Sequence, residues 1–308
     1  MNLRTLRSNH SDIMHCEVKD STGLNDFQKL SNDFGIAIPK VGIERFRIPL
    51  KFKHLDGSIM GHDCEASMFV FCDAHKNGVN MSRFCTILQD ETNEAVVDSN
   101  LFKTVLKRYR TDLRDNETEE LIPESFLSLD FKYPVKQKSL KSDNWGWQYY
   151  SCSLSGHENK DGDIDMKLTL QFEYSSTCPC SLSMAKQYEK EYAAGETTIG
   201  NGIATAHSQR STATVTIKYD IESPITIDEL IELLRVALPT ETQSLVKRVD
   251  EQAFAILNGE NPMFVEHSSR RISAALNSRK EIIDWHAKVE HFESLHSHNA
   301  VAYISKEK

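Results

Sequence analysis

The sequence predicts an α+β fold of two tandem modules, each an antiparallel sheet with helices packed on one face. Two observations predict its elements: several stretches alternate apolar and polar residues like half-buried strands, and helical patterns fall between these stretches. A third predicts the duplication, because the order of hairpin, helices and returning strand occurs twice. We expect a polar N-terminal arm over residues 1–40, a first module over 41–140 and a second over 141–308.

The first module opens with a predicted hairpin. Apolar residues alternate with arginine and lysine over residues 43–53, and residues 64–73 have the pattern of a partner strand. A short helix is expected near residues 82–90, followed by a longer one in which apolar residues between Phe102 and Leu113 share a face. A strand around residues 129–135 returns the chain to the sheet.

The second module repeats this order with clearer patterns. Strands are expected at residues 147–154 and 164–174, then a helix over 181–192 and a strand over 213–219. Three helices follow: one opens at a capping box, Thr226 to Glu229, one ends at Asn258-Gly259, and one starts after Asn261-Pro262. Two further strands, over residues 283–289 and 300–304, close the predicted sheet.

Composition excludes several classes of function. The net charge is -9 and the isoelectric point is near 5.8, so the chain lacks the basic surface that nucleic acids and anionic membranes require. No segment has the pattern of a signal peptide or a bilayer-spanning helix. The seven cysteines are an odd number and form no disulfide framework. We expect a soluble, cytoplasmic protein with neither nucleic acid nor membrane as a partner.

Sulfur and imidazole groups stand at the predicted ends of two strands in the second module. Cys178-Pro179-Cys180 lies just beyond the strand over 164–174, and His207 directly precedes the strand over 213–219. Thiolate, imidazole and carboxylate ligands suit a borderline divalent ion such as zinc and can leave one position open for water. A structural turn with free thiols and a dithiol redox switch are alternative interpretations of the cysteine pair.

Two glutamates on the last predicted helices are candidates for binding. Glu251 and Glu266 each have a simple alternative explanation, a helical ion pair with Lys247 and Arg270, respectively. Glu266, however, lies in the first turn of a helix that follows a proline, where free backbone N–H groups favour a carboxylate. We therefore keep both glutamates as site candidates.

The last predicted strand pair presents a cluster of acid and base groups. The apolar alternation before residue 290, continued with a period of two, places Glu293 on a buried face, and His296 and His298 follow it closely. Histidines change protonation near neutral pH, which suits them to general acid and base catalysis. Polar decoration of a loop is the alternative interpretation of this cluster.

In number and order these residues resemble the type IB GTP cyclohydrolases, a family with the tunnelling fold, over most of the chain. The motifs that carry the resemblance are Met81-Ser82-Arg83-Phe84, Cys178-Pro179-Cys180-Ser181, His207-x-Gln209-Arg210-Ser211, Lys247-Arg248-x-Asp250-Glu251, Asn261-Pro262-x-Phe264-Val265-Glu266 and Ser294-Leu295-His296-Ser297-His298-x-Ala300. The resemblance implies a hydrolase that converts GTP and water to 7,8-dihydroneopterin triphosphate and formate, the first step of tetrahydrofolate biosynthesis. It also implies a homotetramer with active sites at subunit interfaces.

The resemblance implies a role for each candidate residue. Cys178, His207 and Glu251 would hold one divalent metal ion, zinc, manganese or iron, which activates the water that attacks C8 of GTP. Cys180 would lie beside the attacked carbon, and Glu266 would bind the guanine edge. The proton-transfer residues would be Glu293, His296 and His298, and the triphosphate contacts would be Arg83, Arg210, Lys247 and Arg248.

The sequence departs from the family pattern at three places. The segment between Cys180 and His207 is extended, Asn80 stands where a histidine is common, and His267 stands where an aspartate is usual. Two other functions are kept as alternatives. One is the related reductase that converts 7-cyano-7-deazaguanine to an amine with NADPH and a nucleophilic cysteine, and the other is a non-catalytic purine-binding protein of the same fold.

Overall fold

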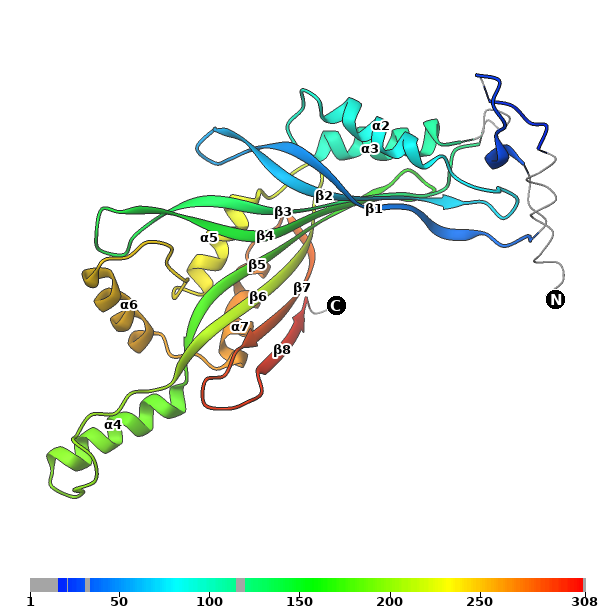
Figure 1. Cartoon of the computed structure of the whole chain (residues 1–308). Coiled ribbons are helices and arrows are strands. Elements are labelled where there is room, and N and C mark those ends of the chain that lie inside the picture. Colours follow the sequence, from blue (N-terminus) through cyan, green and yellow to red (C-terminus); the bar gives the residue numbers. More distant parts are fainter. Residues whose placement is uncertain (1–15, 21, 31–33, 115–119, 307–308) are drawn as a thin grey trace. The chain divides into compact units, whose positions relative to one another are not determined.

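The computed structural model describes residues 16–20, 22–30, 34–114 and 120–306, so residues 1–15 of the expected arm lie outside the described residues. Its strands form one antiparallel sheet whose strand order follows the sequence (Figure 1). The strands are β1 (Ile38–Lys53), β2 (Ile59–Cys72), β3 (Ser125–Lys138), β4 (Trp145–Glu158), β5 (Ile164–Thr177), β6 (Ser208–Tyr219), β7 (Ile282–His291) and β8 (Ala300–Ser305). The helices are a short 3-10 helix η2 (Phe27–Lys29), α2 (Met81–Thr92), α3 (Ser99–Asp112), α4 (Pro179–Ala193), α5 (Ile227–Ala237), α6 (Arg248–Glu260) and α7 (Val265–Asn277).

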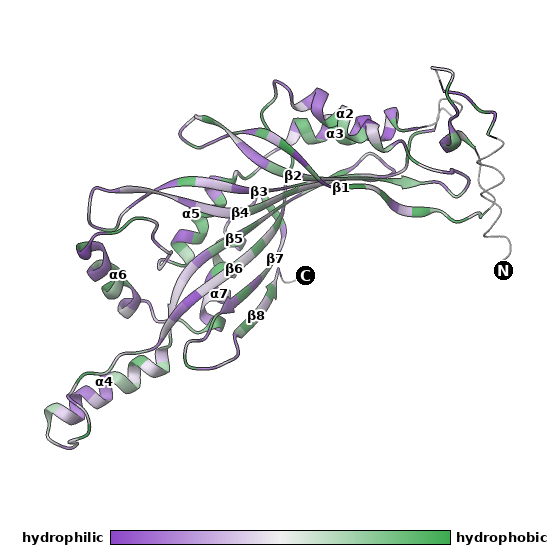
Figure 2. Cartoon of the chain, in the orientation of Figure 1, coloured by the Kyte–Doolittle hydropathy of each residue, from purple (hydrophilic) through white to green (hydrophobic). Residues whose placement is uncertain are grey.

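The alternation of apolar and polar residues that predicted the strands matches the alternation of buried and exposed residues along them. Along β5, buried and partly exposed residues alternate from Met166 to Ser176, and hydrophobic and hydrophilic residues alternate along the strands in Figure 2. Every predicted strand and helix is present. β1 starts earlier than expected, at Ile38, because Pro39 and Gly42 interrupt the apolar pattern at its beginning without ending the strand.

The chain divides into two compact units. Of the described residues, unit 1 comprises those up to Lys53, those within Asp63–Leu129, and Ser155–Asp165, and unit 2 comprises His54–His62, Asp130–Leu154 and those from Met166 onward. The long strands β3 and β4 contribute residues to both units. The module boundary near residue 140 therefore stays a prediction of the sequence.

Unit 1 has its core between its strands and the helix pair α2 and α3. The rings of Phe84 and Tyr109 meet edge to face with centroids 5.1 Å apart, and both residues are fully buried. Arg110, at the end of α3, is also buried. Its guanidinium donates to Glu158 at 2.6 Å and to the carbonyl of Ile122 at 2.7 Å, so the buried charge is paired.

Unit 2 has its core between β5 to β8 and the helices α5 and α7. Helix α7 packs on β7 and β8 and against α5. The predicted capping box of α5 is confirmed, because Glu229 N donates to Thr226 Oγ1 and Thr226 N donates to Glu229 Oε2. Helix α4 instead projects from the end of β5, and Ala185 is the one buried residue along it (Figure 1). No helix in the described part of the chain is long and apolar enough to span a membrane.

The contact between β1 and β2 requires a glycine at position 42. A Cβ atom added there would overlap the carbonyl oxygen of Met68 and lie 2.8 Å from the Cα of Phe69, which are both backbone atoms. We predict that Gly42→Ala lowers the free energy of unfolding by roughly 1–3 kcal/mol or more, measured by urea denaturation. Gly61→Ala is the matched control, because its Cβ would meet nothing within 4 Å. Equal stability of the two variants would show that β1 can move away from Met68.

Candidate functional site

Several segments that are distant in sequence meet where β5 and β7 end and β6 begins. We call this end of the sheet in unit 2 the strand edge. Thr177, at the end of β5, pairs with Ser208, at the start of β6. Ser211 in β6 pairs in turn with His291, at the end of β7. The start of α7 joins them, because Met263 N donates to the carbonyl of Thr177 at 3.0 Å. Several of the residues that the sequence nominated for chemistry therefore lie at this strand edge of unit 2.

Cys178 and His207 occupy adjacent positions on this edge. The backbone N–H of Cys178 donates to the carbonyl of His207 at 3.2 Å, which extends the β5–β6 ladder by one pair. Cys178 is the N-cap of α4, and Pro179 occupies the first helical turn, where its missing N–H is harmless. Cys178 is half-buried and Cys180 is exposed. The backbones of these two nominated residues are thus paired within a single chain.

The His207 ring is oriented by hydrogen bonds. Gln209 Nε2 donates to Ser176 Oγ at 2.7 Å, which turns Gln209 Oε1 toward His207 Nδ1 at 3.0 Å. Because an amide oxygen only accepts, this contact is a hydrogen bond in the tautomer that carries the proton on Nδ1, and that tautomer keeps a lone pair on Nε2. A carbonyl on one ring nitrogen is the usual support for a histidine that binds a metal through the other. In the sequence Gln209 stands in the motif His207-x-Gln209-Arg210-Ser211 without an assigned role, and Ser176 was not nominated.

Glu293 adds a buried carboxylate beside this histidine. Its side chain is 13% exposed, and its Oε2 lies 3.7 Å from His207 Nδ1. Among the described residues, Oε2 has no hydrogen-bond partner although it is buried. A buried carboxylate oxygen without a partner is costly, so this position favours a proton or a cation.

His291 lies beneath the edge as a buried, neutral imidazole. Its Nε2 lies 2.8 Å from the hydroxyl of Tyr174 and 3.5 Å from Ser268 Oγ. Burial lowers the pKa of His291 to about 4, and the nearby charge of Glu266 acts in the opposite direction. Glu266 is an exposed residue in the first turn of α7, and it lies close enough to His291 for its charge to affect the pKa of that histidine. The period-two pattern of the sequence places His291 on the buried face of this strand, but it does not identify Tyr174 and Ser268 as the partners of the ring.

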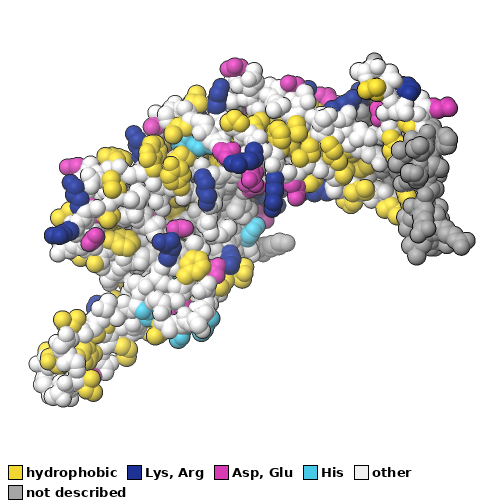
Figure 3. All heavy atoms as spheres, viewed as in Figure 1, with side chains coloured by type: hydrophobic (Ala, Val, Ile, Leu, Met, Phe, Trp, Pro, Cys, Tyr) yellow, Lys and Arg dark blue, Asp and Glu magenta, His cyan; other side chains and the backbone are white. Residues whose placement is uncertain are grey.

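The histidines of the β7–β8 loop face outward. His296 and His298 are exposed, and their rings stack with centroids 4.9 Å apart and planes 10° apart. Histidine side chains are visible on the surface at this end of unit 2 in Figure 3. Both histidines lie in the loop that follows β7, which ends at His291. Their proposed part in proton transfer stays a prediction.

Glu251 does not join Cys178 and His207 in a metal-binding group within the described part of the chain. Glu251 is exposed on α6, and the described residues contain no group of three or more histidine, cysteine, aspartate or glutamate side chains that could hold a metal ion. The predicted set of Cys178, His207 and Glu251 is therefore not assembled within the described part of one chain. The nominated basic residues of unit 2 are all exposed: Arg210, Lys247 and Arg248. Arg83 belongs to unit 1, where it donates to the carbonyl of Asp112 at 2.9 Å.

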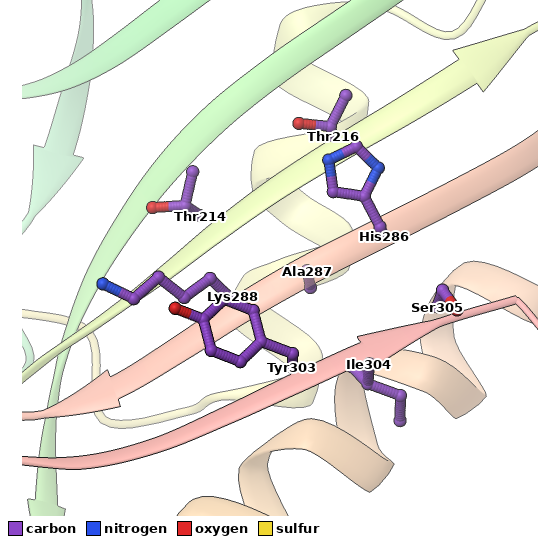
Figure 4. A pocket seen from close by; sticks show the side chains of 8 residues that line it. All are labelled: Thr214, Thr216, His286, Ala287, Lys288, Tyr303, Ile304 and Ser305. Atoms are coloured by element: carbon purple, nitrogen blue, oxygen red, sulfur yellow. The ribbon is translucent and has the colours of Figure 1, made fainter.

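A separate hollow of about 420 Å³ lies on the sheet in unit 2 (Figure 4). Its lining alternates along β6 with buried core residues such as Val215, so most of it belongs to the face opposite the helices. The residues that line it are Thr214, Thr216, His286, Ala287, Lys288, Tyr303, Ile304 and Ser305. Lys288 is paired with Glu290 at 2.6 Å. None of the residues nominated for chemistry lines this hollow.

The chain is similar in sequence to a well-defined group of proteins. Residues 24–302 match the family model described as type I GTP cyclohydrolase folE2. The GTP cyclohydrolase FolE2 of Cereibacter sphaeroides strain ATCC 17029 is 35% identical over 269 residues, which cover 87% of this chain and 70% of that protein. The GTP cyclohydrolase FolE2 of Hydrogenovibrio crunogenus is 34% identical over 282 residues, which cover 86% of this chain and 88% of that protein.

Solved structures with a similar fold are much more distant in sequence. The uricase of Arthrobacter globiformis aligns with a TM-score of 0.51 at 9% identity, covering 90% of this chain and 94% of that chain. A hyper-thermostable mutant of the same uricase aligns with a TM-score of 0.54 at 7% identity, covering 88% and 92%. Identities this low show the fold alone, which is the tunnelling fold that the sequence resemblance implied.

The buried His291 makes stability depend on pH. Its pKa is lower in the folded than in the unfolded chain, so the unfolded chain binds the proton first as the pH falls. We predict that roughly 3 kcal/mol of unfolding free energy is lost between about pH 6.5 and pH 4 because of this group. Urea denaturation over that range should show a flatter dependence for His291→Gln. His296→Gln, at an exposed position, controls for removal of an imidazole; an unchanged slope in His291→Gln would assign the effect elsewhere.

Proposed function

The chain belongs to the type I GTP cyclohydrolase FolE2 family, and from this membership we propose that it converts GTP and water to 7,8-dihydroneopterin triphosphate and formate. It is a hydrolase acting on the carbon–nitrogen bonds of a cyclic amidine, and the reaction is the first step of tetrahydrofolate biosynthesis. The observation that carries the proposal is the strand edge where Cys178 and His207 lie side by side and Glu293 lies 3.7 Å from His207. A thiol, an oriented imidazole and a buried carboxylate are suited to hydrolysis near neutral pH.

Cys178 and His207 would hold one divalent metal ion, zinc, manganese or iron. Thiolate and imidazole donors accept all three ions, and the Gln209 contact leaves His207 Nε2 available for binding. The buried oxygen of Glu293, which has no hydrogen-bond partner among the described residues, also favours a nearby cation. The ion supplies Lewis-acid activation of the water that the hydrolysis consumes. Glu251 is the proposed third ligand.

A second copy of the chain would supply Glu251 in this proposal. Glu251 is exposed on α6 and forms no metal-binding group with the other described side chains of its own chain. A homotetramer with active sites at subunit interfaces would reconcile an incomplete set in one chain with a complete set in the enzyme. We also propose a cytoplasmic location, which the seven free cysteines support.

Proton transfer is assigned to Glu293, His296 and His298, with Cys180 beside the reacting carbon. Opening the imidazole ring and releasing formate require protons to be taken from water and delivered to ring nitrogens. Glu293 is suited to this task because its Oε2 is buried and without a hydrogen-bond partner among the described residues. The carboxylate can accept a proton there and return it. The loop histidines are exposed and close to each other, which supports exchange of protons with solvent.

Guanine recognition is assigned to Glu266. One carboxylate can accept both the N1–H and the 2-amino hydrogens of guanine, and adenine lacks this donor pair. Glu266 is exposed in the first turn of α7 and makes no salt bridge with another described residue, so the predicted ion pair with Arg270 does not occupy it. The triphosphate is assigned to Arg210, Lys247 and Arg248, whose exposed cations suit a strongly anionic group in an acidic chain. For Arg83 the assignment remains a prediction.

The reductase alternative needs a nucleophilic cysteine and NADPH, without a metal. The family membership favours the cyclohydrolase over this alternative and over a non-catalytic purine-binding protein. Incubation of metal-free protein with GTP and a panel of divalent ions tests the proposal, with formate and a fluorescent oxidised pterin as the products measured. Tight GTP binding without turnover in any ion would favour the non-catalytic alternative.

The thiol of Cys178 should be required for the reaction. We predict that Cys178→Ala abolishes both formate and pterin formation, because the variant loses the sulfur donor beside His207. Cys85→Ala removes a half-buried thiol from α2 in unit 1 and serves as the matched control, which should keep wild-type turnover. Turnover by Cys178→Ala at the control rate would remove this thiol from the mechanism.

Replacing the guanine-binding carboxylate should alter substrate choice. A glutamine at position 266 accepts only through its carbonyl, so Glu266→Gln should lose one charge-assisted hydrogen bond to guanine. We predict that kcat/KM for GTP falls roughly 10- to 100-fold, while inosine triphosphate, which lacks the 2-amino group, is affected less. Steady-state kinetics with both nucleotides measures this difference. An equal loss for the two nucleotides would contradict a contact with the 2-amino group.

A further inference from the structure

The connector between α5 and α6, residues 240–247, is bound along one edge to strand β5. Ser175 N donates to the carbonyl of Thr240 at 2.8 Å, and Thr242 N donates to the carbonyl of Glu173 at 3.2 Å. Thr240 Oγ1 also donates to the carbonyl of Ser175 at 2.6 Å. These contacts lie just before Cys178 on the same strand. The path of the connector is therefore fixed relative to the strand that carries the thiol.

The other edge of the connector is bound to the β3–β4 hairpin. Gln137 Nε2 donates to the carbonyl of Thr242 at 3.0 Å, and its Oε1 accepts from Ser244 N at 3.1 Å. Ser139 Oγ donates to the carbonyl of Leu245 at 2.5 Å. A Cβ atom added to Gly146 would overlap Ser244, so the hairpin and the connector are in close contact. The chain thus reaches the start of α6 along a path that is held on both sides.

Asp250, in the first turn of α6, makes the last of these contacts between the connector, the helix start and the β3–β4 turn. Its side chain is fully buried, and both carboxylate oxygens are saturated. Oδ1 accepts from the backbone N–H groups of Lys141 and Ser142 at 2.7 and 2.8 Å. Oδ2 accepts from Ser142 Oγ at 2.6 Å and from Lys247 N at 2.8 Å. One carboxylate therefore joins the β3–β4 turn to the helix start.

We propose that Asp250 is a positioning residue, whose carboxylate fixes the first turn of α6 on the β3–β4 turn and so sets where Arg248 and Glu251 are presented. The inference rests on the proposed function, in which Glu251 binds the metal and Arg248 the triphosphate. Asp250 itself is buried and contacts only the chain. Its neighbours Val249 and Glu251 are exposed, so the buried acid holds the turn while the adjacent acid stays available to a ligand.

The charge on Asp250 is maintained by the same contacts. Burial alone would raise the pKa of this carboxyl, but hydrogen bonds from Ser142, Lys247 and Lys141 outweigh burial and hold the pKa well below its usual range. This shift favours the ionised form of the carboxyl. An ionised acceptor forms stronger hydrogen bonds than a neutral one, which suits a residue that must hold a helix in place.

The substitution Asp250→Asn keeps the hydrogen bonds to the β3–β4 turn and removes the one to the helix start at Lys247. The amide oxygen can still accept from Lys141 N and Ser142 N, and the hydroxyl of Ser142 can rotate to accept from the amide. Lys247 N, however, then faces a second donor and loses its acceptor. We expect hydrogen exchange in a peptide covering residues 243–255 to become faster. Mn²⁺ binding to the metal-free protein, measured by titration calorimetry, should weaken roughly 10- to 100-fold.

Two variants serve as controls for general destabilisation. Thr226→Ala removes the capping box of α5, a helix of the same unit that carries no candidate site residue. Ser142→Ala removes one bond at the turn and leaves Lys247 N its acceptor. Both should keep Mn²⁺ affinity within about threefold of the wild type, and KM for GTP should rise in Asp250→Asn alone. Wild-type exchange at residues 243–255, or wild-type Mn²⁺ affinity, in Asp250→Asn would overturn the proposal.

These measurements distinguish failure of the Asp250 proposal from failure of the proposed function. If the wild-type protein converts no GTP with any divalent ion, the cyclohydrolase proposal fails. The exchange rates and the Mn²⁺ titration still decide whether Asp250 holds α6 and whether that helix contributes to a metal site. A loss of affinity in Thr226→Ala equal to that in Asp250→Asn would identify a purely structural role.

Discussion

The hydrogen-bond register of β5, β6 and β7 is the constraint on which the candidate site depends. It pairs Thr177 with Ser208 and Ser211 with His291, so three segments separated by long stretches of chain end at one edge. Side chains alternate between the two faces of a sheet, so a slip of one residue would turn each of them to the other face. The buried apolar residues of the same strands fix the register, because such a slip would expose them to water. Core packing and site geometry are thus set by the same pairing.

Behind the strand edge, buried polar side chains are hydrogen-bonded to one another. Gln209 links His207 to Ser176, and Tyr174 contacts His291, so most buried polar atoms have a partner. Glu293 Oε2 is an exception among the described residues. Exceptions of this kind are expected where a ligand or a proton completes the structure, because an unpartnered buried oxygen is otherwise destabilising. The connector before α6 extends this support to Asp250, which ties the first turn of the helix that carries Glu251.

Fold and activity rest on different observations. The uricase structures share the fold of this chain at less than 10% identity, so the fold by itself is compatible with more than one chemistry. The GTP cyclohydrolase FolE2 relatives are about 35% identical over most of the chain, and that similarity establishes the family. The arrangement of Cys178 and His207 adds a local chemical reason, which a shared architecture cannot supply.

The sequence by itself determined the strands and helices, because the period of burial is written in the order of apolar residues, as in β5, and because caps such as Thr226 act locally. It also placed Cys178 and His207 at strand ends and identified the family through short motifs. Only the tertiary structure showed that these two residues are neighbours, that Gln209 orients the imidazole and that Glu293 is buried beside it. It likewise showed that Glu251, exposed on α6, forms no metal-binding group with them among the described residues of one chain. Such relations depend on strand register and on packing between distant segments, and no local pattern of residues encodes either.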